Sequence, residues 1–337
     1  MKKFLSILLA LALVLSLGTV AFAVEGEPGT TYEDHDKVTL TKNYKLTNNG
    51  TTSPAETFTF TEPVCKDVEN AAVGVNESTA PTPTIDNVSF SRGQASNTAQ
   101  GTVTITLPDY TNYGVGIYTY TFNEVNNGTA GVSYRSEPIT LKVTVIQGEN
   151  GLIRVPAIHA ETGDGTKIAS FDNTYSAGSL AVKKVVTGNM GDQKKEFDVT
   201  VTFKAPEGET VKSDITYTVD DVTETILAGD NGWTGEKEVK ISLHHDETIT
   251  FTNIPYGVEY TVEESDYETS DGYTTTYTND EGKIEEVKTD ATITNYKNVD
   301  VIDTGVFMDS LPYVLLLVGA CAGLVVFFTR RRMTHKG

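Results

Sequence analysis

The stretch at residues 171–186, FDNTYSAGSLAVKKVV, constrains the fold more than any other part of the chain. It reads as two strands separated by a short hinge at residues 176–179, and side chains in a strand alternate between two faces. Asn173 then shares a face with two aromatic residues, and Lys184 shares one with leucine and valine. Burying an unpaired polar or charged group costs several kcal/mol, so both side chains need partners inside the folded protein.

Short segments of alternating apolar and polar residues recur on both sides of this stretch, between clusters of Gly, Pro and Asn. The 337-residue chain contains 16 Tyr and 29 Gly, a composition typical of strands and turns. No amphipathic helix pattern stands out between the two ends of the chain. The sequence therefore predicts an all-β protein with two tandem β-sandwich domains, at residues 24–175 and 180–300.

Both ends of the chain have the pattern of targeting segments. Residues 1–23 have a charged start, an apolar run and the small-residue pattern Ala-Phe-Ala, which predicts a signal peptide cleaved after Ala23. The alternative is an uncleaved membrane anchor. Residues 311–328 are free of charge and are followed by three arginines within residues 330–337, which predicts a membrane span with its basic tail in the cytoplasm.

Charge and cysteine content narrow the function further. The formal charge is −20 and there is no basic cluster in the body of the chain, which argues against a nucleic-acid partner. Cys321 lies in the predicted span, so Cys65 is left alone in the exported part and no internal disulfide is expected there. Stability must come from the core or from another kind of cross-link.

Three polar residue types recur on apolar strand faces, in the same order, in each half of the chain. They are Lys42, Glu124 and Asn173 in the first half, and Lys184, Glu264 and Asn295 in the second. The spacing from lysine to glutamate is nearly the same in both halves. Because the same order occurs in both halves, these polar residues on apolar faces form a repeated pattern rather than a single exception.

A lysine, a glutamate and an asparagine that meet in a dry core can react with one another. Desolvation lowers the pKa of a buried lysine, which makes the amine neutral and nucleophilic. A nearby carboxyl group can polarise the asparagine amide and shuttle the proton. Attack of the amine on the amide carbon expels ammonia and leaves a neutral amide between the two side chains, without any cofactor.

Two alternatives apply to these residues. Long charged side chains can reach solvent from an apolar face, so all six could be partly wet residues at the rim of a sandwich. A register slip by one residue would point Lys183 or Glu263 inward instead. The run from His244 to Asp246 contains metal-binding residue types, but neighbouring strand residues point to opposite faces, and we expect no metal site.

With these residues, the sequence resembles the major (backbone) pilins of Gram-positive sortase-assembled pili, especially the streptococcal T-antigen type. The matching pieces are TLTKNY, YTFNE and FDNTY in the first half, and LAVKKVVTGN, YTVEE and TITN in the second. The resemblance implies two tandem Ig-like or collagen-adhesin-B-like sandwiches, each closed by a spontaneous isopeptide bond. It assigns the bonds to Lys42–Asn173 and Lys184–Asn295, with Glu124 and Glu264 as the catalytic residues.

The resemblance also extends to the C-terminal tail, residues 301–337, as a cell-wall sorting signal. The pentapeptide at residues 301–305 reads VIDTG, and Asp303 stands where related pilins commonly have proline. By resemblance, a sortase would cleave between Thr304 and Gly305. A lysine of the next subunit would then accept the bond, and Lys167 is the candidate, with an ordinary loop lysine as the alternative.

The expected function is a structural shaft subunit of a covalently polymerised pilus on the Gram-positive cell surface. We expect no enzyme activity beyond the autocatalytic cross-links, and no cofactor. The expected partners are other copies of the chain, a sortase and minor or tip pilins, with membrane contact only before sortase cleavage. The alternative is a wall-anchored adhesin that uses the same sandwiches as a stalk or a binding module.

Overall fold

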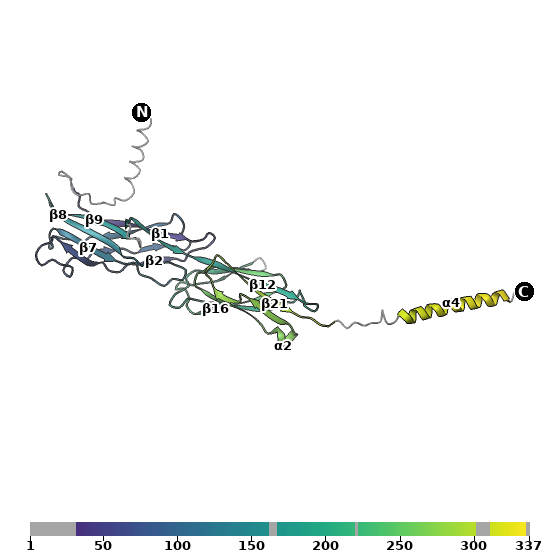
Figure 1. Ribbon diagram of the computed structural model, residues 1–337. Coiled ribbons are helices and arrows are strands. Elements are labelled where there is room, and N and C mark those ends of the chain that lie inside the picture. The colour runs from purple at the N-terminus through teal and green to yellow at the C-terminus, as the bar shows by residue number, and fades with distance from the viewer. Residues whose placement is uncertain (1–31, 162–166, 220–221, 301–310, 335–337) are drawn as a thin grey trace, which may run out of the picture.

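Alternation along the sequence becomes alternation of burial in the structure. The computed structural model describes residues 32–161, 167–219, 222–300 and 311–334. In strand β7 (Gly116–Phe122), every second side chain is buried between two sheets. The described body is two β-sandwiches placed end to end (Figure 1), as the sequence predicts.

The first sandwich packs a four-stranded sheet, ordered β11-β1-β6-β4, against a five-stranded sheet, ordered β10-β9-β8-β7-β3. Strands β2 and β5 form a small additional sheet. The largest buried aromatic side chains of this core include Tyr44, Tyr118 and Phe122. The remaining strands are β1 (Lys37–Leu46), β2 (Glu56–Phe58), β3 (Val64–Glu69), β4 (Thr84–Ile85), β5 (Val88–Phe90), β6 (Gln100–Thr106), β8 (Ile139–Gly148), β9 (Gly151–Glu161), β10 (Lys167–Ile168) and β11 (Ser170–Tyr175).

The second sandwich packs a six-stranded sheet, ordered β15-β14-β17-β12-β21-β19, against a four-stranded sheet, ordered β16-β13-β18-β20. Its core includes Phe203, Phe251 and the single tryptophan, Trp233. The strands are β12 (Ala177–Thr187), β13 (Phe197–Lys204), β14 (Ile215–Val219), β15 (Val222–Ile226), β16 (Glu236–Leu243), β17 (Thr248–Pro255), β18 (Glu259–Glu264), β19 (Thr274–Thr278), β20 (Glu281–Lys283) and β21 (Lys288–Tyr296).

One short helix, α2 (Tyr267–Asp271), interrupts the second sandwich and was not expected from the sequence. The Asp266 side chain accepts hydrogen bonds from the first free N–H groups of the helix, and Gly272 ends it in the left-handed conformation. Both are ordinary capping signals. At five residues, the helix is too short for hydrophobic periodicity to reveal it.

Both sandwiches place their first strand beside their last strand, in parallel. Strand β1 pairs with β11 so that Tyr44 lies opposite Asn173, and β12 pairs with β21 so that Val186 lies opposite Asn295. Parallel neighbours require a long crossover connection, which here is the remainder of each domain. The topology therefore brings residues more than a hundred positions apart into adjacent strands.

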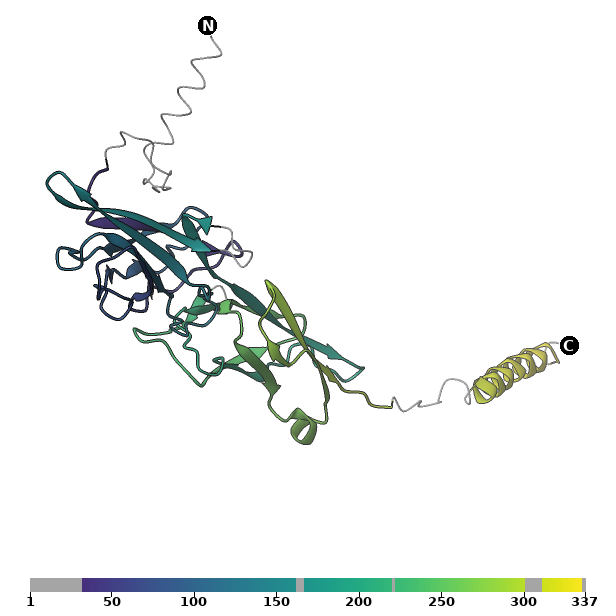
Figure 2. The same ribbon diagram turned by 60° about the vertical axis from the view of Figure 1, so that its left-hand side comes forward.

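The junction between the sandwiches is tighter than the expected four-residue hinge at 176–179. Strand β11 ends at Tyr175 and β12 begins at Ala177, so three of those four residues belong to a strand. The Ser176 N–H donates to Gly131 O at 2.8 Å, and a Cβ on Gly131 would lie 2.5 Å from the Ser176 oxygen. The chain passes directly from one sandwich into the next (Figure 2). The hydrogen bond from Ser176 to Gly131 holds the backbone at this point.

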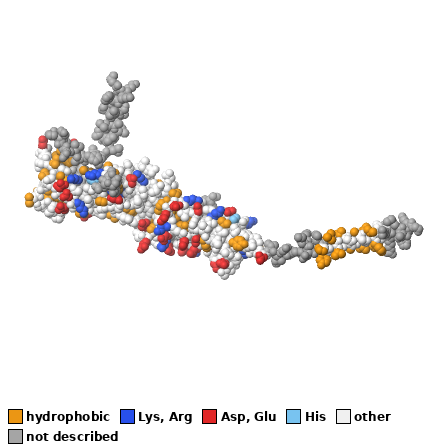
Figure 3. Space-filling model, in the orientation of Figure 1, with side chains coloured by type: hydrophobic (Ala, Val, Ile, Leu, Met, Phe, Trp, Pro, Cys, Tyr) orange, Lys and Arg blue, Asp and Glu red, His pale blue; other side chains and the backbone are white. Residues whose placement is uncertain are grey.

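The C-terminal helix α4 (Leu311–Thr334) is long and apolar enough to cross a membrane over Pro312–Thr329, and this makes it the one candidate span among the described residues. Hydrophobic side chains follow it in Figure 3. This agrees with the predicted span at residues 311–328. The predicted signal peptide at 1–23 and the pentapeptide at 301–305 lie outside the described residues.

Candidate functional site

The first candidate site lies between β1, β11 and the end of β7. Lys42 and Asn173 project into the sandwich from neighbouring parallel strands, offset by two residues in the pairing register. Glu124 reaches them from just beyond β7, on the facing sheet. Lys42 and Asn173 are fully buried, and Glu124 is 6% exposed. The alternative that these three are wet rim residues is therefore wrong.

The glutamate of this site contacts both of its partners at once. Lys42 Nζ lies 2.6 Å from Glu124 Oε1, and Asn173 Nδ2 donates to Glu124 Oε2 at 2.8 Å. Lys42 Nζ also donates to the Asn173 side-chain oxygen. The amine, the amide and the carboxyl group thus form a closed triangle of contacts.

Two backbone groups fix the orientation of this triangle. Asn173 Nδ2 donates a second hydrogen bond to Ser133 O at 2.7 Å. The Arg135 N–H donates to Glu124 Oε2 at 2.6 Å. Both groups belong to a segment that runs along the outer edge of β11, where Ser133 N donates to Thr174 O. The three side chains are held by the main chain as well as by one another.

The surroundings of Lys42 make its amine more nucleophilic. Burial lowers the pKa of Lys42 from 10.5 to about 8, against the opposing attraction of the Glu124 carboxylate. The amine lies 3.9 Å from the centre of the Phe58 ring and 4.3 Å from that of Phe171. These rings exclude water while tolerating the residual positive charge. The neutral fraction of this amine near neutral pH is therefore larger than that of a solvated lysine.

The second candidate site repeats this layout in the second sandwich. Lys184 on β12 and Asn295 on β21 are both fully buried, with the same two-residue offset in a parallel pair. Glu264, at the end of β18 on the facing sheet, forms a buried ion pair with Lys184. Burial lowers the pKa of Lys184, and the ring of Phe197 lies 4.3 Å from its amine.

The asparagine of the second site is less well supported. Within the described part of the chain, Asn295 Nδ2 and Oδ1 are buried without a hydrogen-bond partner. The free carboxylate oxygen of Glu264 instead accepts a hydrogen bond from the Thr275 hydroxyl at 3.3 Å. A buried amide without hydrogen bonds costs free energy of folding, and its conversion to a cross-link would remove that cost.

The structure decides between the register alternatives. The side chain of Lys183 is 45% exposed and pairs with Asp246 on the surface, whereas the side chain of Lys184 is fully buried. Glu263 is exposed, and Glu264 faces the core. The inward residues are those expected from the sequence.

Of the residues considered for metal binding, His244 lies near two carboxylates and His245 does not belong to that group. His244 Nδ1 is 2.6 Å from Glu247 Oε2, and Glu196 completes a surface group whose ligand atoms lie within 4.8 Å of one another. His245 points elsewhere and accepts a hydrogen bond from Val186 N. We assign no metal to this group because exposed carboxylates and histidines gather on surfaces without one.

Lys167 occupies β10 at the edge of the five-stranded sheet of the first sandwich, where it pairs with β9. The residue is exposed. Thr304 and Gly305 lie outside the described residues.

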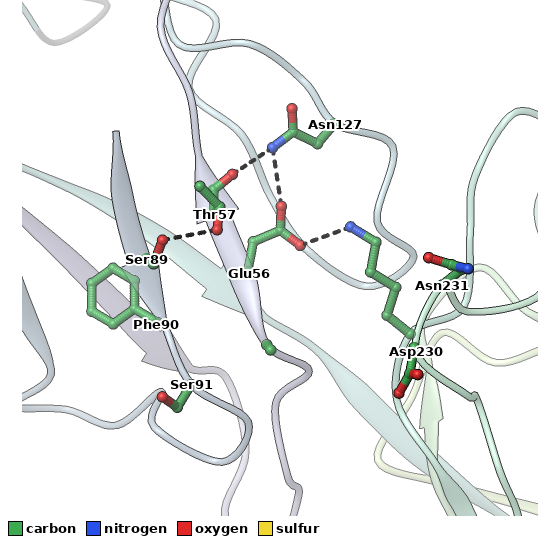
Figure 4. A pocket seen from close by; sticks show the side chains of 10 residues that line it. Glu56, Thr57, Ser89, Phe90, Ser91, Asn127, Asp230 and Asn231 are labelled. Atoms are coloured by element: carbon green, nitrogen blue, oxygen red, sulfur yellow. Dashed lines mark hydrogen bonds and ion pairs between the residues drawn. The ribbon is translucent and has the colours of Figure 1, made fainter. Parts of the chain in front are cut away.

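A buried acid at the domain junction was missed from the sequence. Glu56 is 3% exposed and accepts hydrogen bonds from Thr129 Oγ1 at 2.7 Å, Asn127 Nδ2 at 3.1 Å and Tyr134 OH at 3.1 Å. Lys212 of the second sandwich reaches it across the junction at 3.4 Å. Glu56 and Asn127 line a cleft of ≈ 520 Å³, and Figure 4 shows the hydrogen bond between them there. Glu56 shares a strand face with Phe58, and this alternation could have identified it.

Further contacts hold the two sandwiches together. Asn253 exchanges two hydrogen bonds with the backbone of Thr52, at 2.9 and 3.1 Å. Arg92 forms an ion pair with Asp214, and Tyr175 OH donates to Ser213 Oγ at 2.9 Å. The junction is therefore a specific interface, since it combines buried and charge-assisted hydrogen bonds.

Fold and sites together define a class: tandem β-sandwiches that each bury a lysine, a glutamate and an asparagine between their first and last strands. Residues 37–176, which form the first sandwich, match the family described as the Spy0128-like isopeptide containing domain. Residues 178–297 match a domain of unknown function, DUF7601.

The whole chain is similar to streptococcal pilins. A pilin of Streptococcus pyogenes serotype M1 is 29% identical, over 95% of this chain and 98% of that protein. The crystal structure of the major pilin from Streptococcus pyogenes is 25% identical with a TM-score of 0.50, over 79% of this chain and 100% of that one. The T3.2 major pilin of serotype GAS13637 shares the fold, at 21% identity and a TM-score of 0.53, over 79% of this chain and 99% of that one. The resemblance seen in the sequence is confirmed.

Proposed function

We propose that each sandwich of this pilus shaft subunit closes itself with an isopeptide bond, Lys42–Asn173 in the first and Lys184–Asn295 in the second. One observation carries the proposal. The same three side chains are buried in each domain, with the lysine and the asparagine at the same register offset between the first and last strands. Burying them without a reaction would cost free energy in both domains.

The reaction follows from the contacts at the first site. The neutral amine of Lys42 attacks the side-chain carbonyl carbon of Asn173, and the carboxyl group of Glu124 relays a proton from the amine to the departing nitrogen. The bond from that carbon to Nδ2 breaks, and ammonia leaves. The contacts of the two Glu124 oxygens with the amine and the amide support this role. Glu264 takes the same role in the second domain.

Assembly into a fibre would use the tail and the edge of the first sandwich. A sortase would cleave between Thr304 and Gly305 and transfer Thr304 to Lys167 of the next subunit. The exposure of Lys167 on an edge strand supports this assignment. In this scheme the chain is a cell-surface structural protein whose partners are its own copies, a sortase and minor or tip pilins, and it contacts the membrane only before cleavage.

These bonds would set the route by which force crosses a subunit. Tension that enters at Thr304 would reach Asn295, cross to Lys184, continue to Asn173 and leave through Lys167. Force would cross the second sandwich through its bond, so most of that domain would carry no load. Most of the first sandwich would lie outside the segment that carries force. The two bonds would then have different mechanical roles.

Intact mass spectrometry of the exported chain, residues 24–304, tests the central proposal. We expect a mass lower than the sequence mass by two molecules of ammonia. An unmodified mass would overturn the proposal, and the loss of one ammonia would restrict it to one domain. A sortase-dependent ladder of high-molecular-weight species in cell-wall extracts would support the shaft, whereas a single band would favour the adhesin alternative.

A further inference from the structure

The two sites differ in how the second carboxylate oxygen is held. One oxygen faces the lysine in both: Glu124 Oε1 lies beside Lys42 and Glu264 Oε1 beside Lys184. At the first site the other oxygen accepts from the Arg135 N–H and from the asparagine amide. At the second it accepts from the Thr275 hydroxyl. A side chain therefore occupies the place that a backbone N–H has in the first domain.

The position of Thr275 ties this hydrogen bond to the asparagine. Thr275 on β19 is the direct antiparallel partner of Asn295 on β21. Side chains of directly opposed residues project to the same face, with Cβ atoms roughly 4.5–5.5 Å apart. A carboxylate oxygen bonded to the Thr275 hydroxyl is thus held on the face of the strand pair that carries the Asn295 amide.

Both domains place this support on equivalent elements. The segment containing Ser133 and Arg135 runs along the outer edge of β11, as β19 does along β21. In each domain, the element that flanks the asparagine strand orients the carboxyl group. Tyr277, two residues further along β19, adds a contact when its hydroxyl accepts from Glu264 N at 3.2 Å.

We propose that Thr275 is a positioning residue for the second isopeptide bond: its hydroxyl holds Glu264 so that one oxygen meets Lys184 and the other faces Asn295. This rests on the proposed function. The step it assists is the proton relay described above, in which the Lys184 amine loses a proton, ammonia leaves Asn295 and Glu264 ends in its starting state. Thr275 itself forms and breaks no covalent bond in this step.

The test compares the rates of the two bonds within one molecule. The exported chain is made by cell-free synthesis, quenched at intervals and digested, and the linked peptides that contain each bond are quantified by mass spectrometry. Thr275→Val removes the hydroxyl and keeps the branched shape. We expect the Lys184–Asn295 bond to form about tenfold more slowly, as for one lost hydrogen bond to a charged group, and the Lys42–Asn173 bond to form at an unchanged rate.

Three further variants separate positioning from structure. Thr275→Ser keeps the hydroxyl and should restore most of the rate, and Thr275→Ala should be as slow as Thr275→Val. Thr276→Val alters the neighbouring, outward-facing residue of the same strand and should have no effect. Fluorescence of Trp233 and circular dichroism report whether the second sandwich has folded.

The outcomes distinguish this proposal from the one on which it rests. An unchanged rate in Thr275→Val, or equal slowing in Thr275→Val and Thr276→Val, overturns the positioning role and leaves both bonds standing. Failure of Thr275→Ser to recover the rate also overturns it. If the unsubstituted chain never loses the second ammonia, the second bond itself is wrong, and the role of Thr275 falls with it.

Discussion

The two sandwiches bury the same three residue types on equivalent strands, but the first site is more completely connected than the second. In the first, Glu124 contacts both lysine and asparagine, and the asparagine donates to a backbone carbonyl as well. In the second, Glu264 contacts the lysine and a threonine, while the amide of Asn295 is buried without a partner within the described residues.

The difference shows which parts of the arrangement come from topology and which come from local sequence. Both domains obtain the lysine–asparagine neighbours from a parallel pairing of first and last strands. The hydrogen bonds around the glutamate differ because a loop flanks β11 and a strand flanks β21. The first site is therefore the better preorganised of the two, and the second depends more on individual side chains.

The largest expected difference between the domains is mechanical. Lys184→Ala removes the tie that would let force bypass the second sandwich, so linked subunits should extend when that domain unfolds. Lys42→Ala should leave the force route intact, because most of the first sandwich lies outside the segment that carries force. Single-molecule pulling on linked subunits measures the extension, and equal extension in the two variants would contradict the proposed route.

The next effect is on the stability of the first sandwich. By analogy with a disulfide that closes a long loop, the proposed Lys42–Asn173 bond would contribute roughly 4–5 kcal/mol by restricting the unfolded chain. Lys42→Ala should lower the free energy of unfolding of the first domain by about that amount or more, and should speed its proteolysis. Chemical denaturation with domain-resolved proteolysis measures this. A first domain as stable as the unsubstituted one would argue that no bond forms there.

The pH dependence of bond formation should reveal the buried amine. Only the neutral amine attacks, and burial lowers the pKa of Lys42 to about 8. The rate of the first bond should therefore rise about tenfold per pH unit below about pH 8 and level off above it. Timed quantification of the linked peptide across this range checks the sign and the midpoint. A rate that keeps rising toward the ordinary lysine pKa would show that the amine is solvated when it reacts.

The smallest expected effect is at the junction. Lys212→Met removes the cation that reaches the buried Glu56 and should lower the free energy of unfolding by about 1 kcal/mol, with both bonds retained. The control is Lys204→Met, which breaks the exposed Lys204–Glu259 pair and should cost close to nothing. Thermal denaturation of both variants makes the comparison, and equal shifts would mean that the junction pair adds no specific stability.

Much of this architecture is determined by the sequence itself. Period-two alternation predicts the strands, and it places Lys42, Lys184, Asn173 and Asn295 on the apolar faces that a sandwich turns toward its core. The same rule could have identified Glu56, which alternates with Phe58. The apolar C-terminal run likewise needs no tertiary information to be recognised as a candidate span.

Tertiary structure alone decided which groups meet. Alternation gives a face and not a partner, so the parallel pairing of first and last strands and the placement of Glu124 and Glu264 on the facing sheets depend on how each sandwich closes. The strand that begins at residue 177 depends on pairing with β17 inside the second sandwich. The contact of Lys212 with Glu56 depends on the packing of one domain against the other. The role proposed for Thr275 follows from its pairing with Asn295 across two strands, because proximity between segments distant in sequence is created only by folding.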